Sequence, residues 1–115
     1  MKILCTDLEG TLVPEIWQVL GERLNIPELN LTTREIPNFE DLMRQRMEAL
    51  KKNDINFSKI KEFLVHIEPF KGAKNFLSGL KNKYQVVIVS DTFYELGLPV
   101  VEKLGNYPIF CHHLQ

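Results

Sequence analysis

The sequence predicts an α/β protein with a partial, Rossmann-like parallel sheet of about three strands and a small helical cap inserted after the first strand. Three observations support this prediction. Two short apolar runs end abruptly in polar residues, at Asp7 and at Ser90, as buried strands do. A block of helical periodicity separates these runs, and the order after it is strand, helix, strand. We expect residues 1–13 and 69–115 to form the core and residues 14–68 to form the cap.

The first elements follow from local signals. Residues 2–7 (KILCTD) are expected to form a buried strand. A helix is expected from Pro14 and Glu15 to about Asn25, because proline suits a first helical turn and an acid suits the positive end of the helix dipole. Residues 26–37 contain two prolines and several polar residues, so they are expected to form a loop.

Helical spacing predicts three further helices before the second strand. Asn38 is the expected N-cap of the first, and the others follow a turn near residue 53 and a break at Glu68 and Pro69. The apolar stripes of these helices are Phe39, Leu42, Met43, Met47 and Leu50; Ile60, Phe63, Leu64 and Ile67; and Ala73, Phe76, Leu77 and Leu80.

The last third of the sequence contains the strongest strand signal. Residues 84–90 (YQVVIVS) are continuous and rich in β-branched side chains. A helix with a kink at Gly97 and Pro99 is expected over 93–104, followed by a third strand over 107–114.

Composition narrows the class of protein. The chain has 115 residues, and 14 basic residues nearly balance 15 acidic ones, so we expect no nucleic-acid partner and no anionic membrane surface as partner. No apolar run approaches the roughly 18 residues that span a bilayer, and the N-terminal residues do not resemble a signal peptide. Cys5 and Cys111 stand alone, as reduced thiols do in a cytoplasmic protein, which is the expected location.

Reactive side chains follow two of the predicted strands. Asp7-Leu8-Glu9-Gly10-Thr11 follows the first, and Ser90-Asp91-Thr92 ends the second. Such residues also form ordinary turns and caps. In open α/β sheets, however, ligands bind beyond the carboxyl ends of strands. A carboxylate can attack phosphorus to form an aspartyl-phosphate while a neighbouring acid moves the proton, and Mg²⁺ held by carboxylates reduces the repulsion between two anions.

Two charged residues of the predicted cap have two interpretations each. Arg46 lies inside an apolar helical stripe, where it either extends to solvent or pairs with a buried acid, or points its guanidinium at a carboxylate or phosphate in a pocket. Glu15 is either an acid at a helix N-terminus or a ligand for a substrate ammonium group.

With these residues in place, the sequence resembles the haloacid dehalogenase superfamily of phosphotransferases. The DLEGT segment resembles its first motif, and Ser90 in VVIVSDTF resembles its second. NFEDLMRQRMEAL and EPFKGAKNFLSGLKNKYQVVIVSDTF are similar to the phosphoserine phosphatase branch. DLEGTLVPEIW, TTREIP and SDTFYE most resemble the bacterial form described as a phosphoserine phosphatase/homoserine phosphotransferase. The resemblance covers essentially the whole chain.

The resemblance implies a role for each matched residue. Asp7 would be the phosphorylated nucleophile and a ligand of Mg²⁺. Glu9, in place of the usual aspartate, would be the general acid/base, with its backbone carbonyl on the metal. Ser90 would bind the transferring phosphoryl group, with the backbone of Asp91 beside it. The amino and carboxylate groups of phosphoserine would be held by Glu15 and Arg46. The implied activity is Mg²⁺-dependent hydrolysis of phosphoserine in serine biosynthesis.

Three expectations concern activity and partners. The family has a later lysine and an acidic motif that this sequence lacks, and Lys103 is a poor substitute because it precedes the third strand. We therefore expect the chain to be the N-terminal part of an enzyme. One alternative is a phosphotransferase that uses homoserine as acceptor. Another is a non-catalytic fragment or paralogue that needs a partner chain, with self-association through an open sheet edge.

Overall fold

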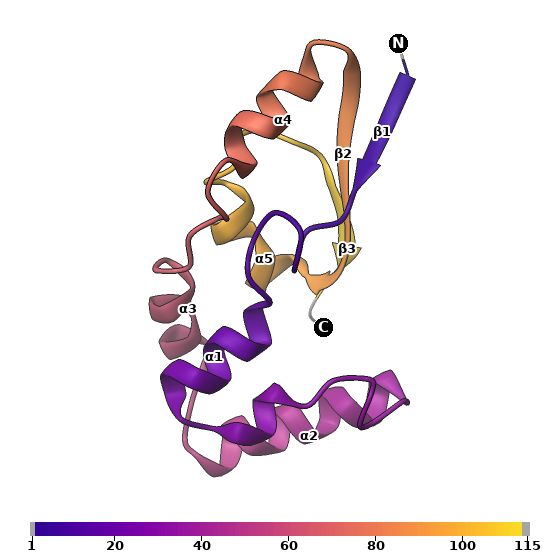
Figure 1. Ribbon diagram of the computed structural model, residues 1–115. Coiled ribbons are helices and arrows are strands. Elements are labelled where there is room, and N and C mark those ends of the chain that lie inside the picture. Colours follow the sequence, from indigo (N-terminus) through magenta and orange to yellow (C-terminus); the bar gives the residue numbers. More distant parts are fainter. Residues whose placement is uncertain (1, 114–115) are drawn as a thin grey trace. The chain divides into compact units, whose positions relative to one another are not determined.

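The computed structural model describes residues 2–113. The chain divides into two compact units, which are considered separately (Figure 1). The sheet unit comprises the residues up to Ile16 and those from Leu64 onward. The helical unit comprises Trp17–Phe63. The prediction that the helical residues act as a cap on a catalytic core stays a prediction.

The sheet unit contains three parallel strands in the order β1-β2-β3: β1 (Lys2–Thr6), β2 (Tyr84–Phe93) and β3 (Ile109–His112). Leu4 pairs with Val86 in the first ladder, and Ile88 pairs with Ile109 in the second. Parallel neighbours need crossover connections, and the helices of the chain supply them. The predicted α/β fold with an open parallel sheet of about three strands is confirmed.

Two helices of this unit, α4 (Ala73–Lys81) and α5 (Tyr94–Val101), pack against β2. Their apolar side chains are buried together with those of the strands and of the loop after β1. The fully or almost fully buried side chains of the unit include Leu8, Leu12, Val13, Leu77, Ile88, Leu96, Val100 and Leu104. The loop after β1 is therefore anchored in the same core as the helices, which gives it a fixed course.

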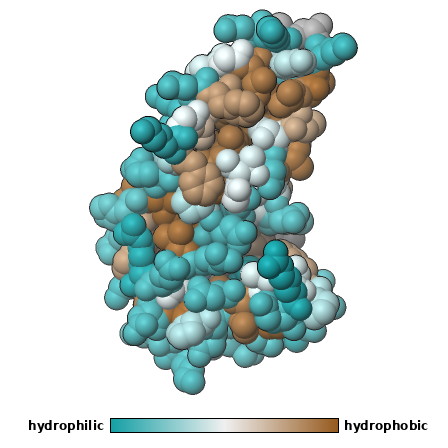
Figure 2. Space-filling model, viewed as in Figure 1, coloured by the Kyte–Doolittle hydropathy of each residue, from teal (hydrophilic) through white to brown (hydrophobic). Residues whose placement is uncertain are grey.

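Alternate residues of the strands leave apolar side chains at the surface. Ile3 is 64% exposed, Val89 is 46% exposed and Phe110 is 64% exposed. Figure 2 shows hydrophobic surface over the part of the molecule that contains the strands and α4. Parallel sheets are ordinarily covered on both faces. Among the described residues, no helix covers the strand positions that carry these three side chains.

The helical unit is built from α1 (Ile16–Leu24), a short 3-10 helix (Pro27–Asn30), α2 (Phe39–Lys52) and α3 (Phe57–Leu64). Two end residues of these helices, Ile16 and Leu64, belong to the sheet unit. Asn38 is the N-cap of α2, as predicted, and its side chain accepts a 3.0 Å hydrogen bond from the Asp41 N–H. The predicted apolar stripe of α2 is partly wrong. Phe39 and Met47 are 38% and 44% exposed, and the buried face consists of Leu42, Arg46, Ala49 and Leu50.

Other boundaries differ from the prediction. β2 continues to Phe93 instead of ending at Ser90, and its pairing with β3 is irregular between Val89 and Phe93. The third strand is shorter than predicted: it covers Ile109–His112, residue 113 is not part of it, and the last predicted position, 114, lies outside the described residues. Ile67 lies after the end of α3, yet it is only 2% exposed. In α4 the predicted apolar stripe is also partly wrong, because Phe76 is 57% exposed. Among the described residues, no helix has the length and apolar character needed to cross a membrane.

Candidate active site

The strand register brings two predicted site residues to one edge of the sheet. Thr6, the last residue of β1, pairs with Ile88 of β2. Asp7 follows Thr6 directly, and Ser90 lies two residues beyond Ile88 on a strand about 5 Å away. Both strands run in the same direction, so Asp7 and Ser90 lie toward the carboxyl end of the sheet, where ligands bind in open α/β folds.

The loop after Asp7 is a tight, hydrogen-bonded turn. The Leu8 carbonyl accepts the N–H groups of Thr11, Leu12 and Val13 at 3.3, 2.8 and 3.2 Å. Gly10 has a φ of +80°, a conformation that glycine adopts without strain, and its N–H donates to the Val13 carbonyl at 2.7 Å. The Asp7 side chain is exposed, and the Thr11 hydroxyl donates to its Oδ2 at 3.4 Å. The turn thus presents the Asp7 carboxylate to solvent.

The Glu9 side chain contacts the start of α1, which the sequence motif does not show. Its Oε1 accepts a 2.8 Å hydrogen bond from the Ile16 N–H, at the start of α1. The first N–H groups of a helix have no partner within the helix, and a carboxylate there also interacts favourably with the helix dipole. Glu9 therefore joins the loop after β1 to the beginning of α1.

The Glu15 carboxylate lies beside the same loop. A methyl group built on Gly10 would be 3.7 Å from Glu15 Oε1. Glu15 is exposed and directly precedes α1. Both interpretations made from the sequence stay open, because an acid at a helix N-terminus and an acid beside a ligand-binding loop are compatible at this position.

Ser90, Asp91 and Thr92 lie in the irregular part of β2. The Thr92 N–H donates to Ser90 Oγ at 3.1 Å. A hydroxyl has one proton and two lone pairs, so Ser90 can still donate its proton to a ligand. Asp91 is exposed. Thr92 is 4% exposed, and its buried Oγ1 has no hydrogen-bond partner among the residues that the structure describes. The sequence placed Thr11 and Thr92 in the two segments that follow the strands, but no separate role was predicted for either of them.

Arg46 is held inside the helical unit. Arg46 is 8% exposed. Its Nη2 donates a hydrogen bond to the Leu31 carbonyl at 3.0 Å, and its guanidinium carbon lies 4.8 Å from the centre of the Trp17 ring. The predicted placement in the buried stripe of α2 is correct. These contacts give Arg46 a structural role, and its assignment to substrate stays a prediction.

The donors for a metal ion can be compared with what Mg²⁺ requires. Mg²⁺ usually binds through one or two carboxylates together with waters and substrate phosphate. The exposed Asp7 carboxylate fits this requirement. In the described part of the chain, no group of three or more His, Cys, Asp or Glu side chains could hold a metal ion. The residues present fit a partial Mg²⁺ site in which substrate and water supply the other ligands.

An open cavity of about 480 Å³ lies in the helical unit, away from the predicted residues. Residues 25–28 form one part of its wall, and the remainder consists of Gln45, Glu48, Ala49, Lys52 and Asn53. None of the residues carried over from the sequence motifs lines it. It is therefore not the predicted catalytic centre.

Comparison with known proteins identifies the relatives of the chain, although no family model matches it. It is 43% identical to "Phosphoserine phosphatase ThrH" of Pseudomonas aeruginosa over all of its residues and 56% of that protein. It is 41% identical to "Phosphoserine phosphatase" of Pseudomonas syringae pv. tomato over 99% of the chain and 48% of that protein. A third relative, "Phosphoserine phosphatase" of Methanocaldococcus jannaschii, is 30% identical over 98% of the chain and 56% of the relative.

These similarities confirm the predicted resemblance. They extend over the whole chain, which spans about half the length of the curated relatives it matches.

Proposed function

We propose that this chain, a homologue along its whole length of part of several phosphoserine phosphatases, contributes the catalytic residues of an enzyme that hydrolyses L-phosphoserine through an aspartyl-phosphate on Asp7. One observation carries the proposal. An exposed carboxylate and a hydroxyl with a proton to donate lie toward the same edge of a parallel sheet, on Asp7 and Ser90.

The first chemical step forms a bond between an Asp7 carboxylate oxygen and phosphorus. The bond from phosphorus to the serine oxygen breaks, and that oxygen takes a proton from the Glu9 carboxyl group, so that serine leaves. The Ser90 hydroxyl donates to an oxygen of the phosphoryl group during the transfer, with the Asp91 backbone beside it. The Thr11 hydroxyl, which contacts Asp7 Oδ2, orients the nucleophile.

The second step releases phosphate. The Glu9 carboxylate takes a proton from water, the water oxygen bonds to phosphorus, and the bond to Asp7 breaks. Mg²⁺, held by the Asp7 carboxylate and the Glu9 backbone carbonyl, would supply positive charge that reduces repulsion between the two anions. Glu15 and Arg46 would bind the ammonium and carboxylate groups of phosphoserine. We propose that the protein serves serine biosynthesis in the cytoplasm, as the resemblance implies.

The test is release of phosphate from phosphoserine with Mg²⁺ present. Asp7→Asn is expected to abolish release and to prevent trapping of a hydroxylamine-sensitive phosphoryl group on the chain. Asp54→Asn is the matched control: Asp54 is exposed in a turn with a φ of +57°, which asparagine also adopts. Undiminished release in Asp7→Asn would exclude the aspartyl-phosphate mechanism.

The same assay separates the proposal from its alternatives. With homoserine added, the formation of phosphohomoserine in place of free phosphate would favour a phosphotransferase, in which the longer Glu9 side chain directs an alcohol instead of water. If the 115-residue chain alone gives neither product in this assay, that result favours the other alternative, a non-catalytic fragment or paralogue that needs a partner chain. Turnover by the chain alone would contradict that alternative.

A further inference from the structure

We infer that Lys103 is a positioning residue: its ammonium group holds the segment in which the chain returns to the sheet unit and, through that segment, the loop that carries Asp7 and Glu9. The return segment is defined as residues 65–70. It follows directly on α3 and leads toward α4. The kinetic part of this inference rests on the proposed function, whereas its structural part does not.

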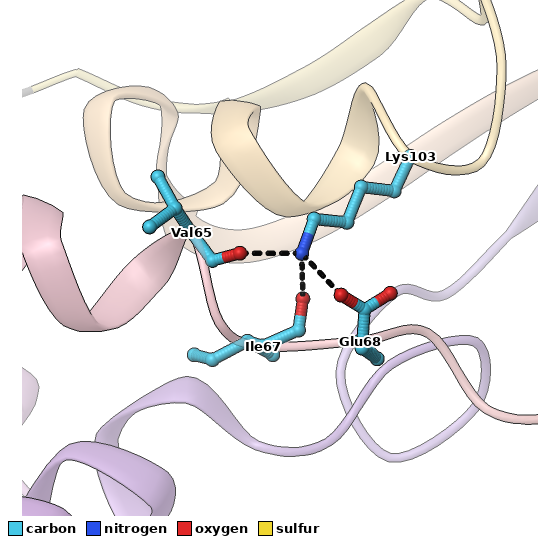
Figure 3. Close-up of polar contacts among 4 residues, drawn as sticks. All are labelled: Val65, Ile67, Glu68 and Lys103. Atoms are coloured by element: carbon cyan, nitrogen blue, oxygen red, sulfur yellow. Dashed lines mark hydrogen bonds and ion pairs between the residues drawn. The ribbon is translucent and has the colours of Figure 1, made fainter.

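The ammonium group of Lys103 has a complete set of partners (Figure 3). Lys103 Nζ donates to the Val65 carbonyl at 2.7 Å, to the Ile67 carbonyl at 2.8 Å and to Glu68 Oε1 at 2.8 Å. An ammonium group has three protons, so these contacts use every donor it has. Lys103 lies just after α5, more than 30 positions from its partners in the sequence. It therefore ties the end of one helix to the segment that follows another.

The return segment needs such donors. The last carbonyls of a helix have no partner within it, and a cation there interacts favourably with the helix dipole. Val65 is the first residue after α3, and Ile67 is 2% exposed. The Glu68 side chain is 73% exposed, so its ion pair alone contributes little. The contact to the Ile67 carbonyl is part-buried and that to the Val65 carbonyl is exposed, so the Ile67 contact contributes most to fixing the course of the segment.

The return segment is bonded in turn to the candidate active site. The Phe70 N–H donates to the Leu12 carbonyl at 2.8 Å, and the Leu12 N–H donates to the Leu8 carbonyl at 2.8 Å. Leu8 lies between Asp7 and Glu9. Pro69, with its fixed φ, limits the freedom of the chain between Glu68 and Phe70. If the return segment moves at Ile67, the hydrogen bonds of Phe70 and Leu12 therefore transmit the displacement to the loop that carries Asp7 and Glu9.

Amide hydrogen exchange tests the structural part. In Lys103→Met the side chain stays unbranched, becomes one atom shorter and loses its donors. We expect the amides of Ile67 and Phe70, which donate to Leu64 and Leu12, to exchange about tenfold faster or more. Lys74→Met makes the same change at an exposed position of α4 and should leave both rates within about twofold of the wild type. Unchanged exchange in a folded Lys103→Met protein overturns the inference.

Two further variants make the test specific. Glu68→Gln removes the ion pair and keeps both carbonyl contacts, so exchange should stay close to that of the wild type. An effect as large as that of Lys103→Met would contradict the role given to the carbonyls.

If Lys103→Met does not fold, the exchange rates are measured in Lys103→Arg instead. The planar guanidinium cannot direct three donors at the same atoms, so faster exchange is expected. Wild-type rates at both amides would overturn the inference.

Kinetics test the positioning role. Lys103→Met should lower kcat for phosphoserine more than it changes KM, because Asp7 and Glu9 act in the chemical step. Lys103→Arg should recover part of the loss, and Lys74→Met should lose nothing. Faster exchange at Phe70 with an unchanged kcat would contradict the role in positioning. An inactive wild type would count against the proposed function alone, because the exchange experiment does not depend on turnover.

Discussion

Glu9 Oε1 accepts the Ile16 N–H at 2.8 Å, so the acid proposed to move the proton also caps the first turn of α1. The two roles use different properties of one side chain. A cap needs only an oxygen acceptor at this position, whereas proton transfer needs an ionisable group. Substitutions at Glu9 can therefore separate the structural role from the catalytic one.

Glu9→Gln keeps an oxygen acceptor for the Ile16 N–H and removes the ionisable group. We expect phosphate release to fall about 100- to 10,000-fold, while the free energy of unfolding falls by less than about 1 kcal/mol from the lost charge at the helix N-terminus. Glu9→Ala should be as inactive and should lose about 1–2 kcal/mol, because the cap is also removed. Urea unfolding and phosphate release measure the two effects. Equal stability of the two variants would contradict the capping role.

Arg46 contacts the Leu31 carbonyl and the Trp17 ring, so its removal should affect folding as well as any substrate. We expect Arg46→Met to lower the free energy of unfolding by about 1–3 kcal/mol, because a charged hydrogen bond and a cation–π contact are lost. Arg44→Met on the same helix is the control. Arg44 forms an exposed ion pair with Asp41, which contributes less than about 1 kcal/mol. If both variants unfold at the same urea concentration, Arg46 has no structural role.

Gly97 of α5 packs closely on β2. A methyl group at this position would lie 3.0 Å from Thr92 Cγ2, and Gly97 is buried. Gly97→Ala gains the roughly 1 kcal/mol that alanine adds to a helix but overpacks against Thr92 at a cost of about 1–3 kcal/mol, so we expect a protein no more stable than the wild type. Gly79→Ala in α4, where nothing lies within 4 Å of the added methyl group, should instead stabilise it by about 0.5–1 kcal/mol through helix propensity. Thermal unfolding compares the two variants, and a Gly97→Ala protein as stabilised as Gly79→Ala would contradict the close packing.

The Glu35 carboxyl group has a pKa below its ordinary value. The Thr32 N–H is the largest cause, followed by the Thr32 hydroxyl, and these donate to Glu35 Oε2 at 2.8 and 2.9 Å. A lowered pKa in the folded state means that the stabilisation is present above the ordinary pKa and is lost as the pH falls through the folded-state value. In Thr32→Val the pKa of Glu35 should rise part of the way, because the backbone donor remains. An NMR titration of the side-chain carboxyl measures this, and an unshifted Thr32→Val protein would exclude the hydroxyl as a cause.

Much of the fold could be predicted because it depends on local patterns. The β-branched run over 84–90 predicted a strand, and the side chain of Asn38 predicted the start of α2. The exact ends could not be predicted. β2 continues through three polar or aromatic positions because β3 lies beside it. Phe39 and Met47 are exposed because burial depends on how neighbouring elements pack, which helical spacing does not show.

The sequence by itself determined that Asp7 and Ser90 lie toward one edge of a parallel sheet, because each follows a strand signal and parallel strands have their carboxyl ends together. Only the tertiary structure decided which groups Glu9 and Lys103 contact. Their partners are the N–H of Ile16 and the carbonyls of Val65 and Ile67, and backbone groups are the same at every position of a sequence. No residue pattern could therefore identify them before the chain was folded.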